Sequence, residues 1–240
     1  LDLVNSTVNG GIVNTGSMSA DVVVSSGNDG LSVQKSTLSG GIVNSGTLFG
    51  NSGLIFSEST LVGNIENSGK VSGAYFDGLR LSSSRLEGDL INSASGTIVG
   101  PNSLTINGST ITGQLINAGT LDGTGRRLSP GAALLVTDSV IGGDIINSGT
   151  LNGTTSAVNN STLGGFVNSG TISNAYGLSF DNVTIAGDIV NSGTIVGNGM
   201  DISKSVIGGQ LINSGTISGR YYALHSLDGS VTRMTIAGND

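Results

Sequence analysis

The sequence predicts an all-β fold: a single parallel β-helix of about nine to ten coils with roughly three short strands in each coil. Two observations predict it. A stretch like residues 146–151 (INSGTL) recurs nine times at intervals of 21 to 30 residues, and self-similarity at such a period is typical of repeat architectures. Each copy divides into short segments in which apolar and polar residues alternate, and no segment has the period of an amphipathic helix.

The first expected element of a unit is a short alternating strand, as in residues 79–81 or 104–106. A serine such as Ser84 or Ser109 follows, and then further apolar residues. The next columns are a glycine that is present in every copy and, two residues later, an apolar side chain such as Ile145. A last apolar column, with Leu151 as an example, lies after the turn. We expect the apolar columns to form the core, because alternating strand residues point to opposite faces.

An asparagine stands at a fixed place in all nine copies. We expect these asparagines to form a structural ladder, in which stacked amides hydrogen-bond from coil to coil. We also expect each asparagine to take the left-handed turn conformation, with the glycine after it at positive φ. The ladder residues are Asn14, Asn44, Asn67, Asn92, Asn117, Asn147, Asn168, Asn191 and Asn213.

Length and composition agree with one repetitive domain. The chain has 240 residues, 41 glycines and 2 prolines, and 36% of its residues are hydrophobic and fall in register, which disfavours disorder. We expect one continuous β-helix repeat domain over residues 1–240, and a fragment of a longer array, because both ends fall inside the repeat. Near the C-terminus, Ile236 is expected to match Ile185 of an earlier copy.

Charge limits the partners. The net charge is −7, so nucleic acid and anionic membrane surfaces are disfavoured as partners. The chain contains no apolar run near 18 residues, so we expect no direct membrane insertion by this segment. It has no cysteine and one histidine, His225, and we predict neither a cofactor nor a metal site.

Function on a repeat scaffold is expected where the repeat is interrupted. Three insertions stand out, around residues 20–30, 123–131 and 220–225, and we expect all three to bulge from the coil. Arg126 and Arg127 are candidates for contact with an acidic glycan, and Tyr221 and Tyr222 for stacking on a sugar or a protein. A calcium contribution from residues 28–30 is disfavoured against a plain turn. The candidate ligand-binding residues are Asp21, Asn28, Asp29, Arg126, Arg127, Tyr221 and Tyr222.

The column just before the asparagines is apolar in eight of nine copies, with Glu66 as the exception. Simple alternation would expose it as a long apolar stripe, the kind of surface that marks an interaction site. The other interpretation is that the strand bends near the turn and buries the column. We favour burial, with Glu66 at a place that reaches solvent.

Two carboxylates allow an enzymatic alternative. Asp89 and Asp144 follow the fixed glycine in copies two coils apart, about 9.6 Å at the ~4.8 Å strand spacing, near the range of an inverting glycosidase pair. Solvated turn carboxylates are the favoured interpretation of both residues. A Ser-His-Asp arrangement would have to use His225, for which a satisfied or exposed side chain is favoured.

Residues 143–151 (GDIINSGTL) and 187–195 (GDIVNSGTI) resemble the repeats of bacterial autotransporter passenger domains. The resemblance implies a right-handed β-helix that is exported through the outer membrane by a C-terminal barrel and acts at the cell surface, often as an adhesin. The expected function is therefore a surface-exposed or secreted adhesin or structural rod without catalysis, at the bacterial cell surface or outside the cell. Its expected partners are a host surface, a glycan or itself, and a polysaccharide-acting β-helix enzyme is the alternative.

Overall fold

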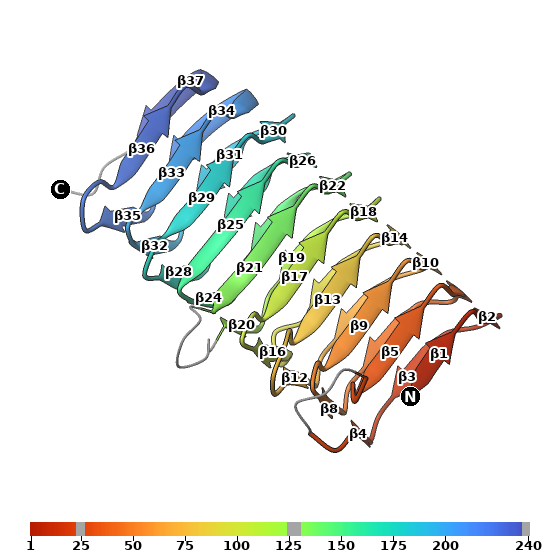
Figure 1. Ribbon diagram of the computed structural model, residues 1–240. Coiled ribbons are helices and arrows are strands. Elements are labelled where there is room, and N and C mark those ends of the chain that lie inside the picture. Colours follow the sequence, from red (N-terminus) through yellow and green to blue (C-terminus); the bar gives the residue numbers. More distant parts are fainter. Residues whose placement is uncertain (23–26, 124–130, 237–240) are drawn as a thin grey trace.

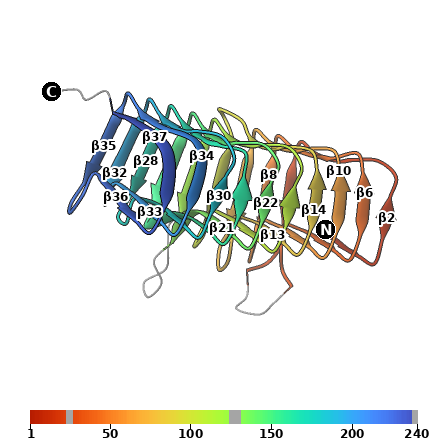
Figure 2. The same cartoon turned by 90° about the horizontal axis from the view of Figure 1, so that it is seen from above.

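The computed structural model describes residues 1–22, 27–123 and 131–236, and this part of the chain is built of strands and turns, with no helix. The chain winds into a solenoid whose coils stack side by side along one axis (Figures 1 and 2). The described strands form three parallel sheets, and each of the nine complete coils contributes to all three. The predicted all-β fold with three sides per coil is confirmed.

The first sheet is 10-stranded and contains the alternating segment that opens each repeat. Its strands are β1 (Asp2–Val4), β5 (Leu31–Gln34), β9 (Leu54–Ser57), β13 (Leu79–Ser82), β17 (Leu104–Asn107), β21 (Ala132–Thr137), β25 (Thr155–Asn159), β29 (Leu178–Asp181), β33 (Met200–Ser203) and β36 (Leu224–Leu227).

The second sheet is 18-stranded, because the fixed glycine divides this side of most coils into two short strands. The strands before the glycine are β2 (Thr7–Val8), β6 (Thr37–Ser39), β10 (Thr60–Val62), β14 (Arg85–Glu87), β18 (Thr110–Ile111), β22 (Val140–Ile141), β26 (Thr162–Leu163) and β30 (Thr184–Ile185). The strands after it are β3 (Ile12–Asn14), β7 (Ile42–Asn44), β11 (Ile65–Asn67), β15 (Leu90–Asn92), β19 (Leu115–Asn117), β23 (Ile145–Asn147), β27 (Phe166–Asn168) and β31 (Ile189–Asn191). In the last two coils the side is continuous, as β34 (Val206–Asn213) and β37 (Ser230–Ile236).

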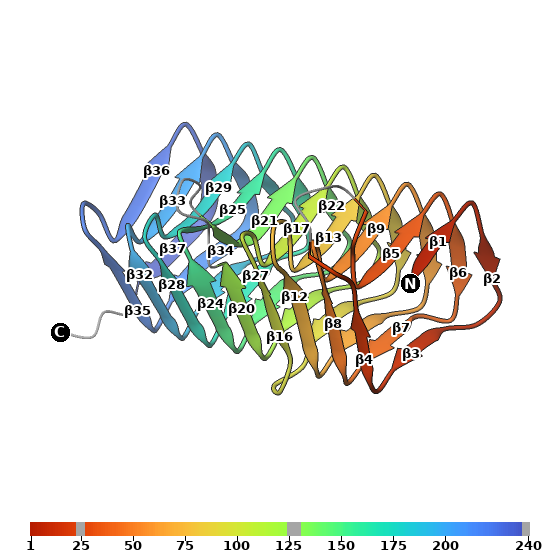
Figure 3. The same cartoon turned by 60° about the horizontal axis from the view of Figure 1, so that its bottom comes forward.

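The third sheet is nine-stranded and follows the asparagine corner (Figure 3). Its strands are β4 (Ser17–Ser19), β8 (Thr47–Gly50), β12 (Lys70–Gly73), β16 (Thr97–Gly100), β20 (Thr120–Gly123), β24 (Thr150–Gly153), β28 (Thr171–Asn174), β32 (Thr194–Gly197) and β35 (Thr216–Gly219).

The columns of the repeat correspond to the strand register in the sheets. Equivalent residues of successive coils pair directly, so Asn117 pairs with Asn147 and Leu121 with Leu151. Insertions between the strands leave this register intact across spacings of 21 to 30 residues. The stacked coils therefore place each column of the sequence on one line along the solenoid.

The core is the set of inward columns, which are buried in each interior coil. Five columns supply it: two from the first sheet, two from the second and one from the third, as with Leu104, Ile106, Ile111, Leu115 and Leu121. Each side chain lies between its equivalents in the coils above and below. At about 1.5–3 kcal/mol for a fully buried aliphatic side chain, this stacking is the main stabilising contribution of every coil.

Our expectation for the positive-φ positions is wrong. The asparagine column and the glycines after it have ordinary φ values, and every described non-glycine residue with positive φ lies at the corner between the first and second sheets, directly before the serine column. Their side chains vary: the corner holds Asn5, Lys35, Glu58, Ser83, Gly108, Asp138, Asn160, Asn182, Lys204 and Asp228. The asparagine faces inward at the end of a strand, which requires extended backbone rather than a left-handed turn.

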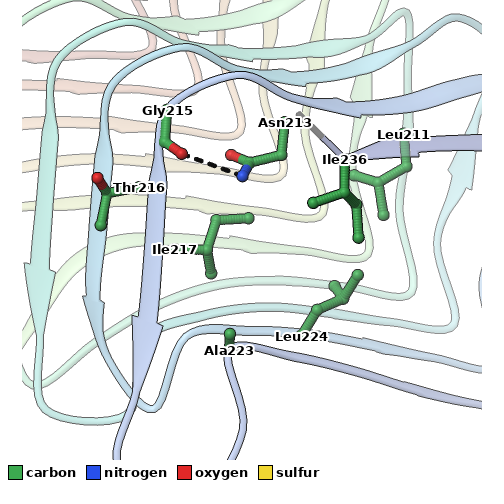
Figure 4. Close-up of a pocket in the computed structure, with 8 residues that line it drawn as sticks. All are labelled: Leu211, Asn213, Gly215, Thr216, Ile217, Ala223, Leu224 and Ile236. Carbon is green, nitrogen blue, oxygen red and sulfur yellow. Dashed lines mark hydrogen bonds between the residues drawn. The ribbon is translucent and has the colours of Figure 1, made fainter. Parts of the chain in front are cut away.

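The C-terminal register also differs from our expectation. Ile236 pairs with Asn213 and Met234 with Leu211, so Ile236 occupies the asparagine column instead of matching Ile185. The difference is already present at Ile207, which pairs with Val231, and the pairing of β34 with β37 slips by one further residue between Ile207 and Gln210. A hollow of about 240 Å³ lies beside Ile236 (Figure 4), and its lining is drawn mainly from the same inward columns as the core.

Candidate functional site

The asparagine column forms a continuous ladder of buried amides. In each of eight steps the side-chain Nδ2 of one asparagine donates to the Oδ1 of the next at 2.7 to 2.8 Å. Asn147, for example, accepts from Asn117 and donates to Asn168, and its Nδ2 also reaches the carbonyl oxygen of Gly149 at 3.3 Å. Because buried amides must be paired, these residues have a structural role.

The serine column forms a second ladder, which the sequence analysis did not identify. The hydroxyl of Ser109 accepts from the backbone N–H of Ser84 in the preceding coil at 3.1 Å and donates to the carbonyl of Asn107 at 2.9 Å. Ser59, Ser139 and Ser205 make equivalent bonds. The signal was present in the sequence as a serine at the same place in most repeats.

The carboxylates of the enzymatic alternative both lie against the fixed glycine of the next coil. Asp89 Oδ1 accepts from the backbone N–H of Gln114 at 2.7 Å and lies against Gly113, where a Cβ would overlap it. The carboxylate of Asp144 lies in the same way beside Gly164. At Gly113 and Gly164 the glycine, which has no Cβ, leaves room for the side chain of the previous coil. The hydrogen bond from Gln114 gives the Asp89 carboxylate a structural partner.

His225 lies in β36 rather than in an insertion, as its strand pairing with Asp201 shows. Its Nδ1 lies 3.1 Å from Asp201 Oδ1, and the hydroxyl of Ser203 donates to the same oxygen at 3.0 Å. Asp201 therefore stands between the two other groups. A nucleophilic triad needs the histidine between serine and carboxylate, so this trio does not have that geometry.

The strands that flank the three predicted insertions meet at one edge of the solenoid. Each falls between a strand of the third sheet and the next strand of the first: between β4 and β5, between β20 and β21, and between β35 and β36. We did not predict this common edge. Each insertion begins six or seven residues after a ladder asparagine, and that constant offset was the available signal.

The predicted residues of the first insertion have different surroundings. Asp21 is exposed. Asp29 Oδ1 accepts from the backbone N–H of Ser52 at 2.9 Å, and the carbonyl of Asn28 accepts from the N–H of Asn51 at 2.6 Å. Asn28 and Asp29 thus fasten the corner to the next coil. Arg126 and Arg127 of the second insertion lie outside the described residues.

The same edge carries all four tyrosines of the chain, Tyr75, Tyr176, Tyr221 and Tyr222. Tyr176, Tyr221 and Tyr222 are exposed, by 62%, 71% and 53%. The ring of Tyr222 stacks on His225, with centroids 4.8 Å apart, and Tyr221 lies beside Tyr222 at 6.4 Å. Tyrosines with exposed rings are unusual on a surface this poor in aromatic residues, and they mark the edge as a binding candidate.

The column before the asparagines points outward, so our preference for its burial is wrong. In most coils the three residues of the strand are buried, half-buried and buried, because the asparagine takes the inward place and its neighbour must face out. Val13 is 66% and Val43 39% exposed. We call this column the valine–isoleucine stripe: Val13, Val43, Glu66, Ile91, Ile116, Ile146, Val167, Val190 and Ile212.

Two features are absent from the described residues. No group of three or more histidine, aspartate or glutamate side chains is placed to hold a metal ion there. No helix in the described ranges has the length and apolar character needed to cross a membrane.

Comparisons of the chain with family models, with curated proteins and with solved structures give no match.

Proposed function

We propose that this solenoid is a surface-exposed or secreted structural rod that associates laterally with further copies of itself, and that adheres through this association. The observation that carries the proposal is the valine–isoleucine stripe. It runs along one face through nine coils, roughly 40 Å at the ~4.8 Å spacing of strands, and eight of its nine members are apolar. Soluble monomeric proteins seldom expose an extended apolar row of this kind.

The surroundings of the stripe support an interface. Two residues before six of the nine stripe members lies a polar side chain: Asn64, Asp89, Gln114, Asp144, Asp188 and Gln210. An apolar centre with a polar border is the usual organisation of protein interfaces.

The period of the stripe favours a second copy as the partner. Its side chains repeat once per coil, and another solenoid of the same sequence presents apolar groups at the same interval. Two copies can therefore place apolar side chains against each other along the whole length. The stripe holds one charge, Glu66, so few charged groups would be desolvated.

The proposal is tested by analytical ultracentrifugation of the chain over a range of concentrations. The stripe variant combines Ile116→Lys with Ile146→Glu. These two residues are paired on neighbouring strands of the second sheet, so the opposite charges attract each other and the pairing of the coils is kept. The matched control is Ser173→Glu with Val196→Lys, the same pair of charges at facing half-buried positions of the third sheet.

We expect oligomers for the unmodified chain and for the control, and monomers for the stripe variant, with unchanged circular dichroism in all three. A monomeric unmodified chain at every concentration would overturn the proposal, as would a stripe variant that associates as strongly as the control.

A further inference from the structure

A cleft of about 500 Å³ opens on the insertion edge, near the C-terminal end of the stack. It lies over three successive corners, whose lengths differ. The corner between β28 and β29 has three residues (175–177), the next, between β32 and β33, has two (198–199), and the third, between β35 and β36, has four (220–223). The short middle corner is therefore recessed between two longer ones.

Tyrosines stand on both sides of the recess. Tyr176 comes from the first corner and Tyr221 from the third, and both line the cleft together with Ala175, Gly197 and Asn198. Exposures of 62% and 71% leave both rings available to a ligand. Tyr222 is occupied by its stacking on His225, so Tyr221 is the ring of this corner that lines the cleft.

The spacing suits one saccharide ring. The two tyrosine corners are two coil steps apart, about 9.6 Å at ~4.8 Å for each step. A ring in van der Waals contact on both faces needs roughly 7–8 Å between its neighbours, at about 3.5–4.0 Å for each contact. The interval between the two tyrosine corners therefore admits one pyranose ring.

Backbone hydrogen bonds hold the cleft open in this shape. The N–H of Arg220 donates to the carbonyl of Gly197 at 2.8 Å, which ties the third corner to the second. The N–H of Tyr176 donates to the carbonyl of Thr154 at 2.7 Å, which ties the first corner to the coil before it. A preformed site loses little conformational entropy on binding.

Charge identifies the kind of saccharide. Arg220 is the one charged residue among those that line the cleft, although the chain as a whole carries −7. In the described part of the chain, no carboxylate lies within 4 Å of its guanidinium. A free guanidinium can bind a carboxylate through two parallel hydrogen bonds, and the Asn198 amide can bind hydroxyl groups.

We propose that the cleft between Tyr176 and Tyr221 binds a pyranose that bears a carboxylate, as in an acidic polysaccharide. The tyrosines stack on the faces of the sugar ring, and Arg220 pairs with its carboxylate. This site lies on the insertion edge and is independent of the stripe, so it is a further function beyond self-association.

Titration calorimetry with three acidic probes tests the proposal: trigalacturonate, a glucuronate-containing hyaluronan oligosaccharide and sialyllactose. The methyl ester of each probe keeps the ring and removes the charge. We expect at least one acid to bind more tightly than its ester, and the acid that binds identifies the sugar. Tyr176→Ala or Tyr221→Ala should weaken binding about three- to tenfold through lost stacking. Arg220→Gln should abolish the preference for acid over ester.

Two variants serve as controls on the same chain. Phe76→Ala removes another exposed aromatic ring of this edge, and Arg85→Gln removes another exposed arginine, which pairs with Glu87. Both should bind as the unmodified chain does. The stripe variant should bind normally too, which separates this site from self-association. No binding of any acid, equal binding of acid and ester, or equal losses in Phe76→Ala and Tyr176→Ala would overturn the proposal.

Discussion

The side-chain amide of Asn117 donates a 2.8 Å hydrogen bond to Oδ1 of Asn147, a residue 30 positions later, and both amides are buried. The same bond joins the neighbouring coils on either side. The solenoid therefore has a polar line inside it, parallel to its apolar columns, and each coil is fastened to the next by a side chain as well as by its sheets.

Asn147→Asp should destabilise the chain. The new side chain still accepts from Asn117 but cannot donate to Asn168, and it buries a carboxylate. We expect a loss of about 1–3 kcal/mol of unfolding free energy, the cost of an unsatisfied buried group. Urea unfolding followed by circular dichroism measures it.

The matched control for that variant is Asn182→Asp. Asn182 donates to Asn160 in an exposed ladder, at a left-handed corner that holds aspartate in another coil, Asp138. Its effect should stay within about 0.5 kcal/mol, as is usual for surface changes. Equal losses at the two sites would contradict a special role for the buried ladder.

Gly149→Ala should also destabilise, for a steric reason. A Cβ on Gly149 would overlap the carbonyl oxygen of Gly119 in the preceding coil, whereas Gly16 of the same column has open space around it. We expect about 1–3 kcal/mol of loss from overpacking at Gly149 and little change for Gly16→Ala. Thermal unfolding of the two variants decides the point, and a similar shift in both would show that contact is not the reason for the glycine.

Asp89 should stabilise the fold through the hydrogen bond that its carboxylate accepts from the next coil. Asp89→Ala removes the acceptor for the N–H of Gln114 and should cost about 1 kcal/mol, while Asp89→Asn retains an acceptor oxygen and should cost less. Urea midpoints of both variants measure the difference. Turnover of an acidic or neutral polysaccharide that is lost in both variants without a change in stability would instead favour the enzymatic alternative.

Lateral association should strengthen with salt. Two copies that each carry −7 repel each other, and added ions screen that repulsion while leaving the apolar stripe unaffected or favoured. We expect the apparent dissociation constant to fall as sodium chloride rises from 10 to 150 mM, the ~30 to ~8 Å range of the Debye length. Weaker association at the higher salt concentration would contradict an apolar interface.

The architecture could be predicted from the sequence because equivalent positions of successive repeats pair with each other in the sheets. Columns such as Ile145 and Leu151 recur at every coil, and alternation shows which residues face inward. The backbone conformation at the asparagine corner was harder to predict. An asparagine beside a glycine is also a common turn sequence, and only the structure shows that Asn147 ends an extended strand and that the left-handed residue lies elsewhere, at Asp138.

The candidate sites were less predictable because they depend on which corners lie over one another. Tyr176 and Tyr221 are 45 residues apart in the chain, and from the sequence we predicted Tyr221 but not Tyr176 as a binding residue. They line one cleft because the corner between them, residues 198–199, is short. The exposure of the stripe depended in turn on the inward position of the asparagine, since strand neighbours face opposite ways.

The asparagine ladder also has a direction. Every amide nitrogen points to the following coil and every amide oxygen to the preceding one, so the eight bonds form one chain of aligned dipoles. Turning a single amide over would set donor against donor on one side and acceptor against acceptor on the other. A whole coil, in contrast, can be added or removed without disturbing its neighbours, because each new coil meets an oxygen above and a nitrogen below. The length of such a rod can change in evolution by one coil at a time.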